Sequence, residues 1–414
     1  MGLTGVRVGY DLRFAADAGI DMILARRLVE PVFQPVVALA DELPVGFEAL
    51  ARGPAGPFHA APALFAAAAR AGLSAELDWL CAAQAGRAYR EGNLPDLALF
   101  VNLNPDTLAT DPPEELVAGY HSLTDEHDVV LEITEQSVMR EPAALMEAVL
   151  DARRRRARIA LDDIGVEPGS LAAMPLINPD IIKLDRSIIQ SRSSSWAVSQ
   201  VVTAVLDEAH RRDAQILAEG IERPEHVAVA RSMGATLGQG YLFGRPGPLP
   251  DHVHRSDLAL ARVTPRTVAH STPFDLLAPT VDVHATTEDL FASMVSHIEN
   301  QATQTTSPAI LAVNLGDGDY DDESRIRHTY LTSRGIDVFV LGTGAARNLG
   351  NRIRGIPLTD DDPLISERAV LFVGSRYGSA AFARRSGDTL YAGTCYNPER
   401  VVEAMLTLVN RLPA

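Results

Sequence analysis

Up to about residue 247 the chain alternates short apolar runs with longer segments that have the composition of helices. The longer segments, such as 63–90 and 196–213, are rich in alanine and leucine. Short strands alternating with helices are typical of βαβ units around a parallel sheet. Eight such runs predict a closed (β/α) barrel, with a doubly wound open sheet as the alternative. The runs are VFQPVVAL (32–39), VGFEAL (45–50), LALFVNL (97–103), DVVLEI (128–133), RIALDD (158–163), DIIKLD (180–185), QILAEG (215–220) and TLGQGYLF (236–243).

A break rich in glycine and proline, GRPGPLP at 244–250, follows the last run. It predicts a linker over 248–283 that contains one helix. Beyond it, the pattern of 284–414 indicates a second, smaller α/β domain. The expected strands of this domain are 309–315, 337–342, 369–374 and 389–396, and its expected helices are 286–301, 322–333, 376–385 and 398–412.

Charge and cysteine content limit the partners and the compartment of the protein. The formal net charge is −17, which would repel a nucleic-acid polymer. No apolar run is long enough for a membrane span, and residues 1–19, an N-terminal extension, lack the apolar core of a signal peptide. Cys81 and Cys395 lie far apart and give neither a disulfide framework nor a zinc spacing. A cytoplasmic protein is therefore expected.

Polar and charged side chains recur at or near the ends of the apolar runs. In a parallel barrel these strand ends meet at one face, where the loops build the active site. Carboxylates gathered there repel one another unless a cation joins them, and oxygen ligands without His or Cys favour Mg²⁺ or Mn²⁺, with Ca²⁺ a third candidate. Each acidic residue taken alone is also a common, solvated start of a loop. The residues are Glu48, Asn102, Glu132, Glu135, Asp162, Asp163, Lys183, Asp185, Glu219, Glu222 and Gln239.

Two adjacent aspartates, Asp162 and Asp163, close the run at 158–163. Neighbouring side chains of a strand face opposite ways, but where a strand gives way to a loop both can turn inward. Such a pair can then serve two metal ions about 3.5–4 Å apart, the spacing of two-metal phosphodiester chemistry. The pair therefore predicts a binuclear metal site.

Eight short motifs resemble those of EAL domains, the bacterial cyclic di-GMP phosphodiesterases, in their order and spacing across residues 20–247. The resemblance implies a modified (β/α)8, TIM-like barrel that hydrolyses cyclic di-GMP to linear pGpG as a homodimer. It also implies Mg²⁺ or Mn²⁺ as cofactors, with Ca²⁺ as an inhibitor. The motifs are 33-FQPVV-37, 48-EALAR-52, 101-VNLN-104, 132-EITE-135, 162-DDIG-165, 182-IKLD-185, 218-AEGIE-222 and 239-QGYLFGRP-246.

The resemblance also implies a role for each matched residue. Lys183 matches the lysine that orients and polarises the attacking water, and Glu219 matches a base or second-metal ligand. Asp162 would bridge the two metals, and Asp163 would serve the second. Ligands of the first metal would be Glu48, Asn102, Glu132 and Asp162; substrate contacts would be Gln34, Leu50, Arg52 and Gln239; supporting residues would be Glu135, Asp185 and Glu222.

The loop after the aspartate pair departs from the family pattern. Active members usually read DDFGTGYSSL, whereas this chain reads DDIGVEPGSL at 162–171. Pro168 fixes φ, removes an N–H donor and restricts Glu167 before it. In the family this loop steadies the second metal and the dimer. Two functions therefore remain open, an enzyme whose activity is set by the loop or the second domain, and a cyclic di-GMP receptor without turnover.

The second domain resembles, more loosely, the DICT sensory domain that accompanies bacterial signalling proteins. The resemblance covers 286–302, 325–342, 369–385 and 391–412. It implies a sensory role that regulates the barrel, with an unknown signal or protein partner. The alternative is a plain packing or dimerisation domain.

Overall fold

The computed structural model describes most of the chain. The described residues are 19–92, 94, 97–104, 107, 116, 127–134, 142–165, 170–191, 196–265, 271–305, 308–347, 349–351, 353–374, 376–409 and 411. Three sequence predictions lie outside them: the N-terminal extension apart from Gly19, the supporting residue Glu135, and the loop at 166–169. Every described helix is too short or too polar to cross a bilayer.

Eight strands close into a barrel, which confirms the predicted barrel and excludes the open sheet. The strand β1 pairs antiparallel with both β2 and β8, whereas the pairs from β2–β3 to β7–β8 are parallel. This reversed first strand makes the barrel a modified one. The strands are β1 (Glu30–Ala38), β2 (Pro44–Arg52), β3 (Ala98–Asn102), β4 (Val129–Thr134), β5 (Arg158–Ile164), β6 (Ile181–Leu184), β7 (Gln215–Ala218) and β8 (Leu237–Gln239).

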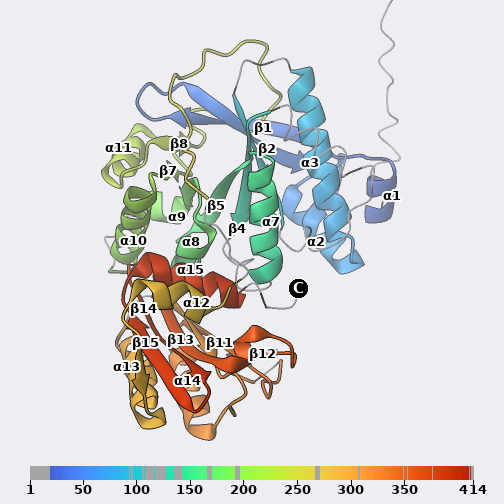
Figure 1. Cartoon of the computed structure of the whole chain (residues 1–414). Coiled ribbons are helices and arrows are strands. Elements are labelled where there is room, and N and C mark those ends of the chain that lie inside the picture. Colours follow the sequence, from blue (N-terminus) through green and yellow to red (C-terminus); the bar gives the residue numbers. More distant parts are fainter. Residues whose placement is uncertain are drawn as a thin grey trace, which may run out of the picture.

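Helices surround the barrel and cover its outward-facing apolar side chains (Figure 1). Leu145 of α7 (Pro142–Arg154) and Val205 of α10 (Trp196–Arg212) are fully buried in the same apolar cluster as the strand residues Leu131 and Ile159. The described helices of this part are α1 (Ile20–Ala25), α2 (Ala61–Ala71), α3 (Ser74–Glu91), α7 (Pro142–Arg154), α8 (Ser170–Ile177), α9 (Arg186–Ile189), α10 (Trp196–Arg212) and α11 (Pro224–Ser232).

The segment after the barrel crosses the amino ends of the strands. The backbone N–H of Ser256 donates to Pro44 O, and that of Val263 donates to Asp180 Oδ1 at 2.7 Å. Leu260 joins the apolar cluster that fills the barrel interior. This strap of residues 251–265 therefore closes the end of the barrel away from the strand termini that carry the predicted site.

The second domain is a mixed sheet of seven strands in the order β12-β11-β10-β13-β14-β15-β9. Side chains of β10 alternate between two clusters, with Ile310 and Ala312 on one face and Leu311 and Val313 on the other. The helices α12 and α15 cover the first face, and α13 and α14 cover the second. The elements are α12 (Pro273–Leu277), η1 (Ala278–Thr280), β9 (His284–Thr286), α13 (Glu288–Gln304), β10 (Ala309–Asn314), α14 (Asp322–Ser333), β11 (Ile336–Gly342), β12 (Ile353–Pro357), η2 (Pro363–Ser366), β13 (Glu367–Gly374), β14 (Gly378–Ser386), β15 (Thr389–Cys395) and α15 (Pro398–Val409).

One predicted helix of this domain is wrong. The segment 376–385 falls largely on β14, which pairs with β13 on one side and β15 on the other. Its first six residues, from Gly378 to Ala383, are buried. A strand buried on both faces loses the alternation that marks a strand, and its alanines favour a helix by propensity. The four predicted strands and the other three helices are confirmed.

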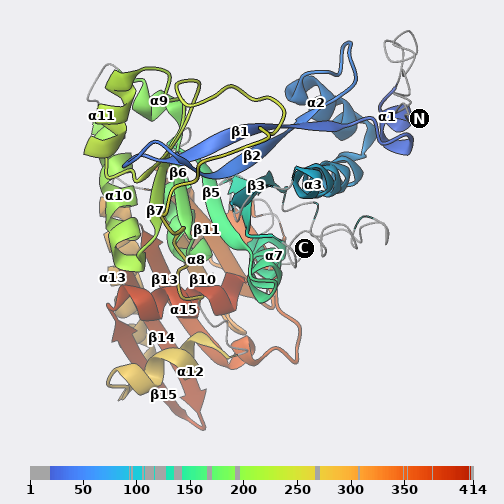
Figure 2. The ribbon, with the colours of Figure 1, turned by 90° about the horizontal axis from the view of Figure 1, so that it is seen from above.

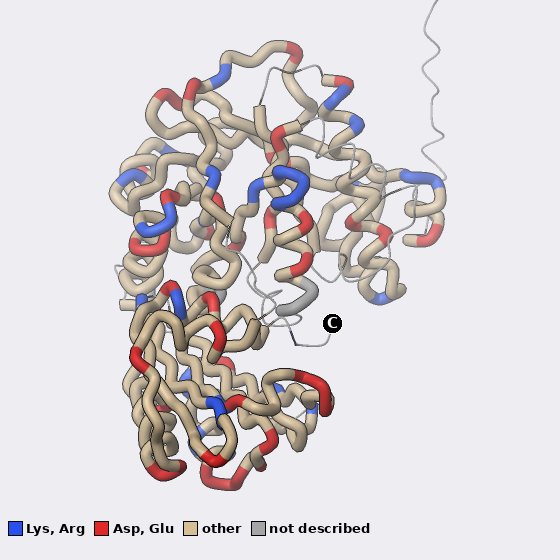
Figure 3. Tube along the Cα trace, in the orientation of Figure 1, with Lys and Arg blue, Asp and Glu red and all other residues tan. Residues whose placement is uncertain are grey.

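The two domains share the helix α8. It lies against β10, β13 and α15 of the second domain as well as against β5 and α10 of the barrel. Figure 1 and Figure 2 both place α8 between the barrel and α15. Basic positions are scattered among acidic ones over both domains (Figure 3). The formal net charge of the whole chain is −17.

Candidate active site

Lys183 lies at the centre of the predicted acidic cluster. Its side chain, on β6, is 1% exposed. Its Nζ atom lies 2.7 Å from Glu132 Oε1, 3.0 Å from Asp162 Oδ2 and 2.9 Å from Glu219 Oε1. Burial alone would lower the pKa of Lys183, but these carboxylates together raise that pKa well above its usual value. Lys183 is therefore a buried ammonium group that strands β4, β5 and β7 surround with acceptors.

The adjacent residues Asp162 and Asp163 both face the site because β5 bulges at this point. The register between β5 and β6 shifts between Leu161 and Ile164, and Asp163 has a φ of 60°. A bulge re-aims one side chain of a strand, and aspartate is among the residues that tolerate this left-handed conformation. The backbone N–H of Asp163 donates to Asp162 Oδ1 at 2.8 Å.

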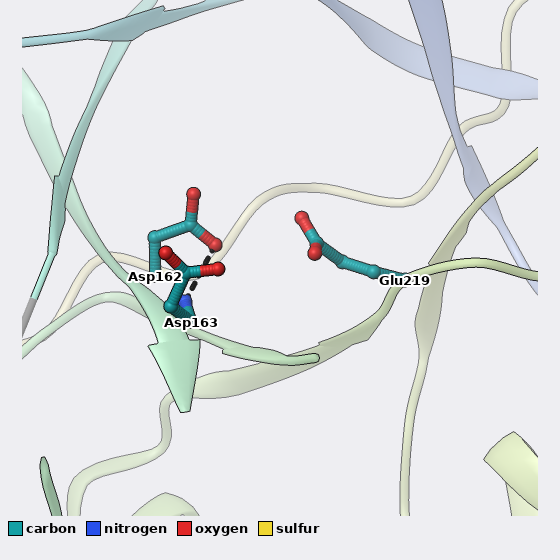
Figure 4. A group of neighbouring side chains, drawn as sticks. All are labelled: Asp162, Asp163 and Glu219. Carbon is teal, nitrogen blue, oxygen red and sulfur yellow. Dashed lines mark hydrogen bonds between the residues drawn. The ribbon is translucent and has the colours of Figure 1, made fainter. Parts of the chain in front are cut away.

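Glu219 completes a group of three carboxylates with this pair. Figure 4 shows Glu219 extending toward Asp162 and Asp163 from the opposite side of the site. One oxygen from each of the three residues lies within 4.8 Å of the other two. The glycine after the pair is also constrained, because a side chain on Gly165, at φ 109°, would meet Ile188 Cγ1 at 2.7 Å. The glycine of the DDIG sequence is therefore the residue that this turn can accommodate.

A second group lies on the neighbouring strands. The Asn102 amide donates to Glu48 Oε1 at 2.9 Å and to Glu132 Oε2 at 3.0 Å. Gln239 Nε2 donates to Glu48 Oε2 at 2.6 Å and lies 3.5 Å from Gln34 Oε1. The reversed direction of β1 places Gln34 directly opposite Glu48 in the β1–β2 pair. The barrel thus brings these five predicted residues together.

The cluster carries more negative charge than Lys183 can balance. Burial raises the pKa of Glu132 well above its usual value, and Glu48 adds to the effect. Burial also raises the pKa of Asp163, and it raises the pKa of Glu219 to about 8. Burial opposes the ionisation of Glu48 too, yet Lys183 and the neighbouring donors lower its pKa. The carboxylates of the cluster are Glu48, Glu132, Asp162, Asp163 and Glu219.

This donor set fits a hard divalent cation. It offers carboxylate oxygens and the Asn102 amide, and the described cluster of Asp162, Asp163 and Glu219 contains neither His nor Cys. Such oxygen ligands select Mg²⁺, Mn²⁺ or Ca²⁺ over softer metals. A cation would also relieve the repulsion that raises the pKa values of Glu132 and Asp163.

The predicted substrate contacts on β2 lie beside this cluster. Leu50 lines a cavity of about 300 Å³ that also reaches Asn102 and Glu132. Arg52 is half-buried, and its Nη1 donates to Ala51 O at 2.8 Å. Arg52 is the last residue of β2, the strand that also carries Glu48 of the cluster.

The two remaining described supporting residues lie further out. The Asp185 carboxylate caps α9 by accepting from the backbone N–H of Ser187 at 2.8 Å, and it adds to the raised pKa of Asp163. Glu222 is exposed, and its backbone N–H donates to His226 Nδ1 at 3.2 Å. Asp185 thus belongs to the electrostatic surroundings of the site. Glu222 contributes a local hydrogen bond from its backbone N–H to the His226 ring.

The sequence analysis missed Asp78, which lines the same cavity together with Phe65 and Cys81. Asp78 is 5% exposed and accepts from Thr107 Oγ1 at 2.5 Å. A carboxylate on the buried face of a helix costs free energy unless it has a partner or a role. The run AELDWLCAA around Asp78 in α3 was therefore an available signal.

Fold and site together define a modified β/α barrel with a candidate divalent-cation site at its strand ends. The EAL domain profile matches residues 18–246. The chain therefore belongs to the EAL domain family, as its motifs indicate.

Known proteins resemble the chain in part. An uncharacterised protein of Azorhizobium caulinodans is 30% identical over 260 residues, which cover 59% of this chain and 35% of that protein. The probable cyclic di-GMP phosphodiesterase PdeN of Escherichia coli is 32% identical over 155 residues, 37% of this chain and 30% of that protein. The chain thus spans about a third of the length of these two relatives. The manganese and cyclic di-GMP complex of Klebsiella pneumoniae BlrP1 matches with 26% identity and a TM-score of 0.48, covering 53% of this chain and 56% of that one.

Proposed function

We propose that the chain is a cyclic di-GMP phosphodiesterase that hydrolyses its substrate to linear pGpG. Membership of the EAL domain family supports this, as does the name of the relative PdeN, a probable cyclic di-GMP phosphodiesterase. The observation that carries the proposal is the buried Lys183 beside the group of Asp162, Asp163 and Glu219. Metal-dependent phosphodiester hydrolysis uses such a set to hold cations and position a water molecule.

The donor set suits two cations that share one carboxylate. When bound, Mg²⁺ or Mn²⁺ would supply Lewis acidity that favours deprotonation of water and neutralises the phosphodiester. Ca²⁺ also fits oxygen ligands but accepts a larger and looser shell, which agrees with its predicted inhibition. The first cation would be held by Glu48, Asn102, Glu132 and Asp162, and the second by Asp162, Asp163 and Glu219.

Side chains of the chain itself would handle the water and the substrate. The Lys183 ammonium donates hydrogen bonds and would orient the attacking water by its oxygen. Glu219, whose Oε1 atom lies 2.9 Å from Lys183 Nζ, would accept the proton of that water when the Glu219 carboxyl group is ionised. Arg52 would bind a phosphate through paired N–H groups. Gln34, which faces Glu48 across the β1–β2 pair, and Gln239, which donates to Glu48, would donate to the rest of the dinucleotide.

Glu48→Gln tests the assignment, because it keeps the shape of the side chain and removes one anionic ligand. Turnover should fall by more than about 100-fold, since Lewis-acid stabilisation is worth several kcal/mol. Binding of Mn²⁺, followed by calorimetry, should weaken in the same variant. Turnover equal to that of the unsubstituted chain would contradict the assignment.

The second candidate function is a cyclic di-GMP receptor without turnover. The sequence VEP at 166–168 favours it, because Pro168 lacks an N–H and restricts the residue before it. Tight binding of cyclic di-GMP that leaves the ligand intact in the presence of Mn²⁺ would support the receptor. Formation of pGpG would exclude it.

We also propose that the second domain regulates the barrel as a DICT-like sensory domain. What supports this is the sequence resemblance and the contact of α8 with both domains. A small signal molecule or a protein partner would act on this domain. The homodimer and the cytoplasmic location stay predictions.

A further inference from the structure

The apolar side chains of α8 pack in two different hydrophobic clusters. Leu171, Met174 and Ile177, spaced by three residues, pack in the outer core of the barrel. Ala172 and Leu176, spaced by four residues, pack in the core of the second domain. These spacings place the two sets on different faces of one helix. A helix that is hydrophobic all round must be buried on all sides. The helix α8 therefore depends on the second domain to bury the face that carries Ala172 and Leu176.

The same helix begins close to the site in sequence. Asp162 and Asp163 lie on β5, and α8 begins at Ser170, five residues after Gly165. Asp163, at φ 60°, holds a conformation that costs free energy for a residue other than glycine. Such a conformation persists where the surrounding structure holds it in place. Around Gly165, these surroundings include Ile188 of α9 and Val201 of α10.

The second domain also holds the helix on the other side of the turn. Glu399 of α15 pairs with Arg212 of α10, and Arg211 Nη1 lies 3.6 Å from Glu399 Oε1. Arg376 Nε lies 3.9 Å from Asp207 Oδ2 of α10. The helices α8 and α10 pack on each other. A Cβ placed on Gly165 in that turn would lie 3.5 Å from Val201 Cγ1 of α10. The second domain therefore clamps both helices that flank the turn.

We propose that Leu176 is a positioning residue through which the second domain sets the cation affinity of the site. Leu176 packs in the core of the second domain and fixes α8. The helix α8 packs on α10, whose Val201 lies near Gly165 in the turn that presents Asp163 beside Asp162 and Glu219. A change in the core of the second domain then alters how well these three carboxylates bind a cation together. The inference rests on the proposed function, since it takes this group as a cation site.

The test is the affinity of the full chain for Mn²⁺ alone, measured by titration calorimetry without substrate. Leu176→Ala and, from the side of the second domain, Met405→Ala both truncate the shared cluster. Each should weaken Mn²⁺ binding by roughly 10-fold or more, the usual effect of removing a group that orients metal ligands. Leu176→Met keeps the volume and should restore wild-type binding. Leu176→Val replaces Leu176→Ala if that variant does not fold.

The matched control is Leu331→Ala in α14. Leu331 is 0% exposed but packs on the opposite face of the second-domain sheet, away from α8. It should lower the melting temperature as Met405→Ala does, yet leave Mn²⁺ affinity unchanged. Equal weakening in Leu331→Ala would overturn the inference, and so would wild-type affinity in folded Leu176→Ala and Met405→Ala. An unsubstituted chain that binds no Mn²⁺ would overturn the proposed function, and this inference with it.

Discussion

Lys183 Nζ lies 3.0 Å from Asp162 Oδ2, and both side chains are buried inside the barrel. An ammonium group in this place does two things at once. It balances part of the charge of the carboxylates around it, and in the proposed mechanism it would donate to the attacking water. The stability of the cation-free chain and the proposed chemistry therefore depend on the same side chain.

Lys183→Met should separate these two contributions. In the presence of chelator, the loss of the ammonium leaves Glu132, Asp162 and Glu219 unpaired, and the free energy of unfolding should fall by about 3–5 kcal/mol. Saturating Mn²⁺ should recover part of this loss, because the cation replaces the missing charge. Turnover should stay at least about 100-fold below that of the unsubstituted chain, because the water is no longer oriented. Urea unfolding with and without Mn²⁺ measures the first effect, and unchanged stability in chelator would contradict it.

Asp163→Asn should remove one cation without disturbing the turn. Asparagine tolerates the left-handed conformation at φ 60°, and the neutral amide removes a carboxylate whose pKa burial and Asp162 already raise. Stability in chelator should equal or exceed that of the unsubstituted chain, while calorimetry should show the loss of one of two bound Mn²⁺ ions.

Asp163→Ala is the matched comparison for the backbone. It should lose the same cation and cost about 1–2 kcal/mol more in stability, because alanine lacks the tolerance of asparagine for this conformation. Two Mn²⁺ ions bound with unchanged affinity in Asp163→Asn would remove Asp163 from the cation site.

Cation binding should release a proton at neutral pH. In the cation-free chain burial raises the pKa of Glu219 from 4.5 to about 8, so its carboxyl group is largely protonated at pH 7. A cation needs the ionised form and displaces the proton. The number of protons released by Glu219 should therefore decline as the pH rises through about 8, and Mn²⁺ affinity should increase with pH up to this range and level off above it.

Titration calorimetry at pH 7 in two buffers of different ionisation enthalpy measures this release. The observed heats should differ between the buffers for the unsubstituted chain and differ less for Glu219→Gln, which lacks this proton. Equal heats for the unsubstituted chain in both buffers would contradict the assigned pKa direction or the role of Glu219.

Restoring the family pattern in the loop after the aspartate pair should raise turnover. The change replaces Ile164, Val166, Glu167, Pro168 and Gly169 so that the segment 162–169 reads DDFGTGYS. It returns a backbone N–H and removes a negative charge near an anionic substrate. Activity with Mn²⁺ measures the effect, with Glu167→Gln alone as the control for charge. No gain would place the control of activity elsewhere, in the second domain.

Most of the barrel was predictable because its strands are short apolar runs between helical segments, and because the motif residues stand at the strand ends. Glu48, Glu132, Lys183 and Glu219 come together for that reason. The sequence indicated that both aspartates must turn toward the site, but it did not indicate the bulge of β5 and the positive φ of Asp163 that achieve this. Asp78 was missed because its Ala-rich helix was interpreted as a packing element rather than as part of the site.

The relation between the domains was harder to predict. The segment SLAAMPLI of α8 has no charged residue, which could have indicated burial on two sides, but the partner of its second face is set by tertiary packing. The strand β14 was predicted as a helix, since burial on both faces hides its period of two. Leu260 gave no local signal that the strap would close the barrel.

The central claim is tested most directly by incubating the purified chain with cyclic di-GMP and following pGpG by chromatography. Parallel samples contain Mg²⁺, Mn²⁺ or a chelator, and Glu48→Gln serves as the matched control. The account predicts pGpG in the presence of either cation and none with the chelator or the variant. Intact cyclic di-GMP in every sample, or pGpG formed equally with the chelator, would contradict it.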